Sequence, residues 1–168
     1  MKHIISFILV SLFAITASAQ DIKVGYFSGD AAIKSMPEYA AVQQKINDLR
    51  AQYDNELKEA EKEFSEKYEL FLEQQSKMAT AIREKRQSEL QLMMERNVAF
   101  RAESQRLLKQ AEADEMKPLN DKLNAALAAL GSANGYIIIV NTDANAVPYI
   151  TPAFAVDINE EVKSELNK

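Results

Sequence analysis

Residues 38–117 read EYAAVQQKINDLRAQYDNELKEAEKEFSEKYELFLEQQSKMATAIREKRQSELQLMMERNVAFRAESQRLLKQAEADEMK, 80 residues without a glycine or a proline. Residue types with high helix propensity dominate this run, chiefly Glu, Lys, Gln, Ala, Leu, Arg and Met. Because glycine and proline are the residues that most often end helices, the run predicts helix throughout. We expect a capping box at its start, with Ser35 as the N-cap residue, Glu38 reaching back to it and Pro37 in the first turn.

Apolar residues recur along this run with two different periods. In the first half they follow steps of 3, 4 and 4 residues, a period typical of a nearly straight or slightly right-handed coil. In the second half, steps of 3 and 4 residues give a heptad-like stripe. Residues 74–89, where the stripes meet, are mostly polar. The first stripe consists of Ile46, Leu49, Tyr53, Leu57, Ala60, Phe64, Tyr68, Phe71, Gln75, Ala79 and Ile82, and the second of Leu90, Met93, Asn97, Phe100, Ser104, Leu107 and Ala111.

Two architectures fit this pattern. A single helix would extend about 120 Å, whereas a hairpin would have two arms of about 60 Å each that bury one stripe against the other. The absence of glycine and proline at the bend favours the single helix. The change of period, the polar middle and the charges favour a hairpin that bends between about Gln74 and Arg86, because residues 45–73 carry a net charge of −4 and residues 75–110 a net charge of +4. The residues themselves leave both architectures open.

The flanking segments predict a small sheet. Residues 23–27 (KVGYF) and 136–140 (YIIIV) predict strands, and the second is the best candidate for a core strand. Residues 141–145 predict a turn. Residues 146–150 predict a third strand, which Pro148 places at an edge of the sheet.

Shorter helical segments follow the long run. Pro118 is expected to bend or break the helix near Lys117, because proline removes an internal hydrogen bond. Beyond it, leucines in residues 119–130 continue a helical face, which ends at the glycines that follow. Residues 157–166 predict a final amphipathic helix with a box-like start at its first aspartate.

The fold class predicted is therefore α+β, with a β-body that carries a helical arm. Residues 20–37 and 118–168 form the body, and residues 38–117 form the arm. A three-stranded sheet with an open face is not stable alone, so we expect the chain to oligomerise. The residues expected to hold the subunits together are Tyr136, Ile137, Ile138, Ile139, Val140, Val147 and Tyr149.

The first 19 residues have the features of a secretory signal peptide. Lys2 gives a positive start, residues 4–15 are apolar, and Ala17-Ser18-Ala19 supplies small residues for cleavage after Ala19. The apolar stretch is too short to cross a bilayer. The exported chain would carry 19 Lys and Arg against 25 Asp and Glu, a net charge of −6.

Composition argues against an enzyme. The chain has no cysteine, and its only histidine, His3, lies in the signal peptide. The exported protein would therefore have no imidazole base, no thiol nucleophile and no Cys/His metal site. We expect no catalytic residues, no cofactor and no metal. The acidic balance argues against a general nucleic-acid binder. The closely spaced glutamates of residues 56–66 alternate with lysines and predict a solvated helix face rather than metal ligands.

Two features of the run have a functional interpretation beside a structural one. The aromatic and methionine residues belong either to the seam between helices or, since methionine adapts to varied apolar surfaces, to a cavity that binds a client. A basic cluster, with a net charge of +3 over residues 77–86, is either a solvated turn or a site that assists client capture or approach to an anionic membrane surface. The first set is Phe64, Tyr68, Phe71, Phe100, Met78, Met93, Met94 and Met116; the second is Lys77, Arg83, Lys85 and Arg86.

The order of these segments resembles the Skp/OmpH family of periplasmic chaperones. The specific resemblance lies in residues 136–140 (YIIIV) followed by residues 143–149 (DANAVPY), where the family has an apolar strand, then Asp-Ala-Asn-Ala-Val and an aromatic residue. Residues 23–27 and the final helix match the family's layout. This chain departs from the enterobacterial pattern in being acidic overall.

The resemblance implies a homotrimer in which a β-body carries three helical hairpins around a cavity. It implies that unfolded outer-membrane proteins are held there without ATP, in the periplasm, until delivery to the assembly machinery. No residues are assigned to lipopolysaccharide, which some relatives are suggested to bind. The alternative function is that of a structural coiled-coil protein of the envelope that binds a fixed partner.

Overall fold

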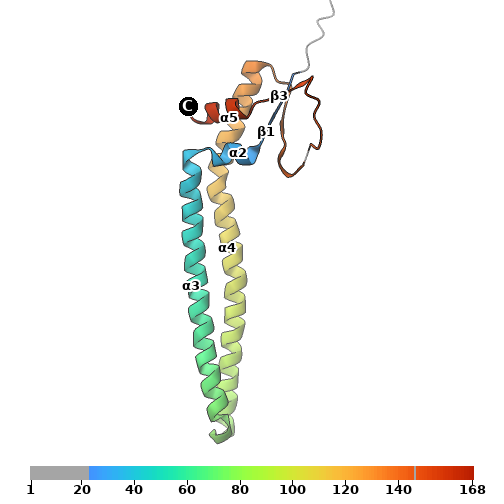
Figure 1. The fold of residues 1–168 in the computed structure, drawn as a ribbon. Coiled ribbons are helices and arrows are strands. Elements are labelled where there is room, and N and C mark those ends of the chain that lie inside the picture. Colours follow the sequence, from blue (N-terminus) through green and yellow to red (C-terminus); the bar gives the residue numbers. More distant parts are fainter. Residues whose placement is uncertain (1–22, 146) are drawn as a thin grey trace, which may run out of the picture.

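A computed structural model describes residues 23–145 and 147–168. The predicted signal peptide and its cleavage site lie outside the described residues. Figure 1 shows a long helical hairpin that projects from a small body. In chain order the elements are β1 (Val24–Phe27), α2 (Gly29–Lys34), α3 (Pro37–Gln74), the 3-10 turn η1 (Gln75–Lys77), α4 (Thr80–Asn134), β2 (Ile138–Asn141), the 3-10 turn η2 (Asp143–Asn145), β3 (Ala155–Asp157) and α5 (Asn159–Leu166).

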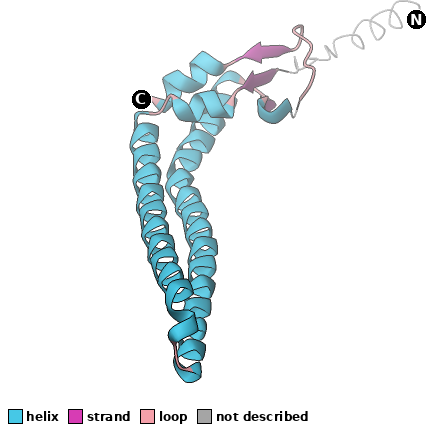
Figure 2. Cartoon of the chain, turned by 60° about the horizontal axis from the view of Figure 1, so that its bottom comes forward, coloured by secondary structure: helices cyan, strands magenta, loops and turns pink. Residues whose placement is uncertain are grey.

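The long run is a hairpin, so the single straight helix is wrong. Helices α3 and α4 lie side by side, and the chain reverses at η1, inside the predicted bend region (Figures 1 and 2). The reversal needs neither glycine nor proline, because Met78 and Ala79 adopt the extended conformation, with ψ angles of 142° and 147°. Two ordinary residues in the β region are enough to end one helix and redirect the chain into the next.

The two predicted stripes form the seam of the hairpin. Tyr53 packs edge-to-face on Phe100 with ring centroids 6.2 Å apart, and the Asn97 side-chain amide donates a hydrogen bond of 3.1 Å to the Ala60 carbonyl. Nearly every residue of the two stripes between Ile46 and Ala111 is buried or half-buried, apart from those at the bend. Ion pairs join the helices along the seam between Glu38 and Lys122, Lys45 and Glu115, and Glu61 and Arg101.

The predicted capping box at the start of α3 is wrong. Ser35 instead ends the short helix α2, and its hydroxyl donates a hydrogen bond of 2.6 Å to the Ala32 carbonyl. The N-cap residue of α3 is Met36, which makes no side-chain cap, and the Glu38 carboxylate accepts from Lys122 at 2.9 Å. Pro37 does occupy the first turn of α3, as predicted.

Helix α4 continues through Pro118 to Asn134, so the predicted break is wrong. The residues after the proline are held in the helix by packing, because Leu119, Leu123 and Leu130 are all buried in the body. The free energy gained by burying these leucines exceeds the cost of the backbone hydrogen bond that proline removes. Gly135 ends the helix in the left-handed conformation, with φ of 69°, as expected of a glycine C-cap.

The sheet has the order β2-β1-β3, and both pairings are parallel. Val24 pairs with Ile138 on one side and with Ala155 on the other. The third strand was predicted at residues 146–150 but lies at Ala155–Asp157. Proline explains the difference, since Pro148 and Pro152 have no backbone N–H for a ladder, and the strand begins only after both of them.

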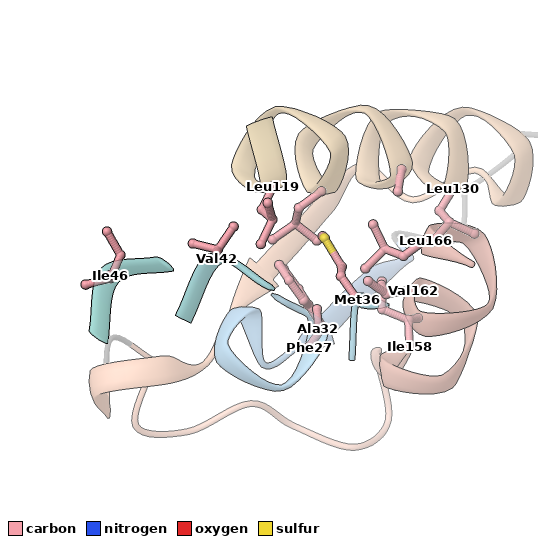
Figure 3. Packing of buried hydrophobic residues seen from close by; sticks show 12 residues of the cluster. Phe27, Ala32, Met36, Val42, Ile46, Leu119, Leu130, Ile158, Val162 and Leu166 are labelled. Carbon is pink, nitrogen blue, oxygen red and sulfur yellow. The ribbon is translucent and has the colours of Figure 1, made fainter. Parts of the chain in front are cut away.

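One hydrophobic core fills the body and reaches the first turns of the arm. Figure 3 shows Met36 among side chains from α4 and α5, and Ile158, Val162 and Leu166 of the final segment are almost fully buried. Helix α5 begins at Asn159 rather than at the box-like start predicted; Asp157 accepts from the Asn159 backbone N–H at 3.0 Å instead. The body therefore fixes the base of a long arm whose far end lies outside this core.

Candidate functional site

The predicted basic cluster lies at the far end of the arm. Lys77 belongs to η1, and Arg83, Lys85 and Arg86 to the first turns of α4. Lys85 and Arg86 both approach the Glu89 carboxylate, at 3.8 and 2.7 Å. The hydrogen bond from Arg86 holds the pKa of Glu89 below its usual range, so this carboxylate is charged at neutral pH. The bend thus gathers an excess of positive charge at the end of an acidic molecule.

A groove with a volume of about 730 Å³ runs along one side of the seam next to this cluster. We call it the basic groove. Its charged side chains are Lys67, Arg86, Glu89 and Arg96. Its apolar side chains are Leu70, Phe71, Met78, Ile82, Leu90, Leu92 and Met93.

A second groove of about 390 Å³ shares Phe71 and Leu90 with the first. We call it the neutral groove, because its polar side chains are Gln75, Gln87 and Gln91 and none of its lining side chains is charged. Its remaining apolar side chains are Phe64, Tyr68, Leu72 and Met94.

The buried side chains of Phe71 and Leu90 form the ridge between the two grooves. Helical periodicity explains the division. On α3, residues 67, 70 and 74 lie on one side of Phe71, and residues 64, 68 and 72 lie on the other. The two grooves therefore occupy opposite sides of the hairpin.

The structure divides the aromatic and methionine set between the seam, the body core and the two grooves. Phe100 packs on Tyr53 within the seam, and Met116 packs against the body core. Phe64 stacks on Tyr68 with ring centroids 5.8 Å apart, in the neutral groove. The other members of the set line one groove or both: Phe71, Met78, Met93 and Met94.

Sequence reasoning missed several apolar residues of this site. Leu70 and Leu72 are 51% and 47% exposed, and Leu92 is 46% exposed, although all three lie in regular helix. The sequence does contain a pattern that indicates exposed leucines here, because Leu70, Phe71 and Leu72 are consecutive. Three consecutive apolar residues cannot all face one seam of a helix.

The body has a second exposed apolar surface. Ile137 and Ile138 are 60% and 54% exposed, and Tyr149 is 77% exposed. Of the other residues expected to join subunits, Tyr136 and Ile139 pack against the core, and Val140 and Val147 are half-buried. Strands β2 and β3 form the two edges of the sheet.

Within residues 23–145 and 147–168, no helix is long and apolar enough to cross a membrane. The same residues contain no group of His, Asp or Glu side chains that could hold a metal ion. The glutamates of residues 56–66 are exposed on α3, as predicted for a solvated face.

Comparison with known proteins places this architecture in one family. The model of the OmpH-like outer membrane protein family matches residues 23–166. The crystal structure of a candidate outer membrane chaperone of Caulobacter crescentus, described as OmpH-like, shares the fold with a TM-score of 0.66 at 19% sequence identity, over 86% of this chain and 83% of that chain. A search of the curated proteins found no match. Because the family match spans nearly all of the described residues, the chain belongs to the OmpH-like family.

Proposed function

We propose that this protein is an ATP-independent holdase chaperone of the periplasm, which binds unfolded outer-membrane proteins and prevents their aggregation on the way to the outer membrane. One observation carries the proposal: exposed apolar side chains gather in two grooves at the far end of the arm, away from the core. Membership of the OmpH-like family supports it.

The chemistry of the grooves suits a holdase. Unfolded clients present many different apolar segments, so a chaperone that binds them needs adaptable contacts rather than one tight site. Met78, Met93 and Met94 provide such contacts, because the unbranched thioether side chain fits varied apolar surfaces.

The proposed location follows from the predicted signal peptide, residues 1–19. Export and cleavage after Ala19 would release the chain into the compartment that outer-membrane proteins cross.

The proposed assembly is a homotrimer joined through its bodies. Two sheet edges and the exposed apolar side chains of Ile137, Ile138 and Tyr149 give the body a surface that a second and a third copy can cover. Three arms around one axis would then surround a client from several sides, and the affinities of the separate arms would combine.

The basic cluster is proposed to steer clients toward the arm. Positive charge at the end of a projecting arm raises the rate of encounter with acidic unfolded chains or with an anionic membrane surface, and salt weakens the effect. Replacing Lys77, Arg83, Lys85 and Arg86 by Gln should slow client capture at low salt and flatten its salt dependence. An unchanged capture rate with unchanged salt dependence would mean that the cluster is only a solvated turn.

The test of the proposed function is an aggregation assay. An outer-membrane β-barrel unfolded in urea is diluted with or without residues 20–168 of this chain, in the absence of nucleotide, and light scattering is followed. Suppression at a stoichiometric ratio is expected. Unchanged aggregation would contradict the proposal and favour a structural envelope protein with a fixed partner.

A further inference from the structure

The two grooves are alike in their apolar residues and differ in charge. Both include the ridge residues Phe71 and Leu90, and each has at least one exposed leucine and at least one methionine. The polar side chains of the neutral groove are all glutamines, whereas the basic groove has three cations and one carboxylate. Because the two grooves differ mainly in charge, we expect them to bind client segments that differ in charge.

The cations of the basic groove are not fully neutralised by the protein. Lys67 pairs with Glu63 at 2.5 Å, and Arg86 pairs with Glu89 at 2.7 Å. Arg96 has no carboxylate within ion-pair distance among the residues that the structure describes. Arg96 is exposed and lines the groove with Leu92 and Met93, so a carboxylate of a bound segment can reach its guanidinium.

We propose that the basic groove selects unfolded polypeptide segments in which an Asp or Glu stands among apolar side chains. The apolar side chains would cover Leu70 and Met93, and the carboxylate would pair with Arg96. This inference rests on the proposed function and names the class of segment that one of its two binding surfaces prefers.

The groove favours a polypeptide over an anionic lipid. Glu89 lies within it and is ionised, which disfavours a headgroup with several negative charges. Gln74 offers both a donor and an acceptor to a peptide backbone. A single client carboxylate beside apolar residues matches one cation without a partner.

The preference of the basic groove for acidic segments must come from contacts inside the groove, because the net charge of the whole molecule disfavours acidic segments. The exported chain has a net charge of −6, which repels acidic peptides at long range. At about 0.15 M salt this repulsion is screened beyond about 8 Å, while contacts within the groove persist. Tighter binding of acidic segments at that salt concentration would therefore come from contacts inside the groove.

The test uses two labelled 12-residue peptides of apolar and uncharged polar residues that are identical except at one central position, which is Glu in one peptide and Gln in the other. Fluorescence anisotropy measures their binding to residues 20–168 at 0.15 M salt. We expect tighter binding of the Glu peptide. Arg96→Gln should weaken that peptide about two- to fivefold and leave the Gln peptide unchanged.

Matched variants separate the groove from its surroundings. Lys109→Gln removes the same charge from the same helix, outside both grooves and outside the basic cluster, and should change neither peptide. Leu70→Gln should weaken the Glu peptide about tenfold. Val98→Gln, at an exposed apolar residue of α4 outside both grooves, should leave the binding of the Glu peptide unchanged.

Equal binding of the two peptides, or equal effects of Lys109→Gln and Arg96→Gln, would overturn the inference. So would a loss of binding to phosphatidylglycerol vesicles in Arg96→Gln with peptide binding intact, which would identify a lipid site. The aggregation assay is run on the same samples. Suppression by the wild-type chain without a peptide preference refutes this inference alone, whereas no suppression refutes the proposed function.

Discussion

Asp143 caps helix α2 from the other end of the sequence: its carboxylate accepts a hydrogen bond of 2.7 Å from the hydroxyl of Ser28, 115 residues earlier. The second carboxylate oxygen accepts from the Asp30 backbone N–H at 2.8 Å. Asn141 accepts from the Gly29 backbone N–H at 3.1 Å, and a Cβ on Gly29 would lie only 2.7 Å from its side chain. These hydrogen bonds join the end of β2 and the turn η2 to the beginning of α2, so they fix α2 against the sheet.

The first prediction concerns this cap. Asp143→Ala should lower the free energy of unfolding at pH 7 by about 1–2 kcal/mol, because orphan donors at the start of α2 lose their acceptor. The hydrogen bonds from the Asp30 amide and the Ser28 hydroxyl lower the pKa of Asp143. The wild-type advantage is therefore present above pH about 4, the ordinary range of the group, and is lost as pH falls through the lowered value. Urea titrations at pH 7 and pH 3, at one protein concentration, measure it; an equal difference at both pH values would contradict the assignment.

The second prediction uses two residues with left-handed backbone. Gly135 and Ala144 have φ of 69° and 54°, a conformation that costs a residue with a side chain about 1 kcal/mol or more. Gly135→Ala should therefore lower the melting temperature, while Ala144→Gly should raise it. Calorimetry of both variants checks the opposite signs; a change of the same sign in both would count against the backbone conformation described here.

The third prediction concerns the ridge between the grooves. Phe71 is 7% exposed, so Phe71→Ala should remove up to about 3 kcal/mol of local stability and speed hydrogen exchange at the far end of the arm. Leu72→Ala is the control, since Leu72 is 47% exposed and its truncation should change exchange little. Similar acceleration in both variants would mean that Phe71 does not hold the two helices together.

The fourth prediction tests the proposed trimer. Ile138 is 54% exposed in the single chain, so Ile138→Asp should leave the fold intact by circular dichroism. In a trimer the same charge would be buried without a partner, which costs several kcal/mol, and the mass from light scattering should fall to that of a monomer. Val98→Asp on the arm, where Val98 is 66% exposed, should keep the trimer mass. A monomeric wild-type chain at micromolar concentration would refute the trimer.

Periodicity was the most reliable guide to the fold. The two stripes predicted which residues face the seam, since a long amphipathic helix has few alternatives once its apolar face is known. The residues alone could not separate hairpin from rod, because the bend at Met78 and Ala79 uses ordinary residues in extended conformation. The change of period, the polar middle and the charges favoured the hairpin without deciding the question, and the resemblance to a known family decided it.

Local signals failed where tertiary contacts overrode them. Ser35 has the right spacing for an N-cap, but the unpredicted helix α2 ends there and uses its hydroxyl. Pro118 was expected to bend or break α4, yet burial of Leu119 and Leu123 keeps the helix continuous. These outcomes depend on packing partners distant in the sequence, which local patterns do not report.

The candidate site was predicted in part. The charges of the basic cluster are evident from composition, and their place at the bend followed from the polar middle of the run. The grooves were anticipated only as a cavity lined by the aromatic and methionine residues. Their exposed leucines were missed, because a stripe analysis assigns apolar residues to the seam and passes over off-stripe residues such as Leu70 and Leu72. Which of them are exposed depends on how the two helices pack.

The most direct test of the holdase account is the state of a client held by this chain. An outer-membrane β-barrel diluted from urea with residues 20–168, without nucleotide, is examined by limited proteolysis before and after detergent micelles are added. The account predicts a client that stays soluble and protease-sensitive in complex with the chain, and becomes folded and protease-resistant on transfer to micelles. A client that precipitates as fast as it does alone, or that stays soluble but cannot fold when micelles are supplied, would contradict it.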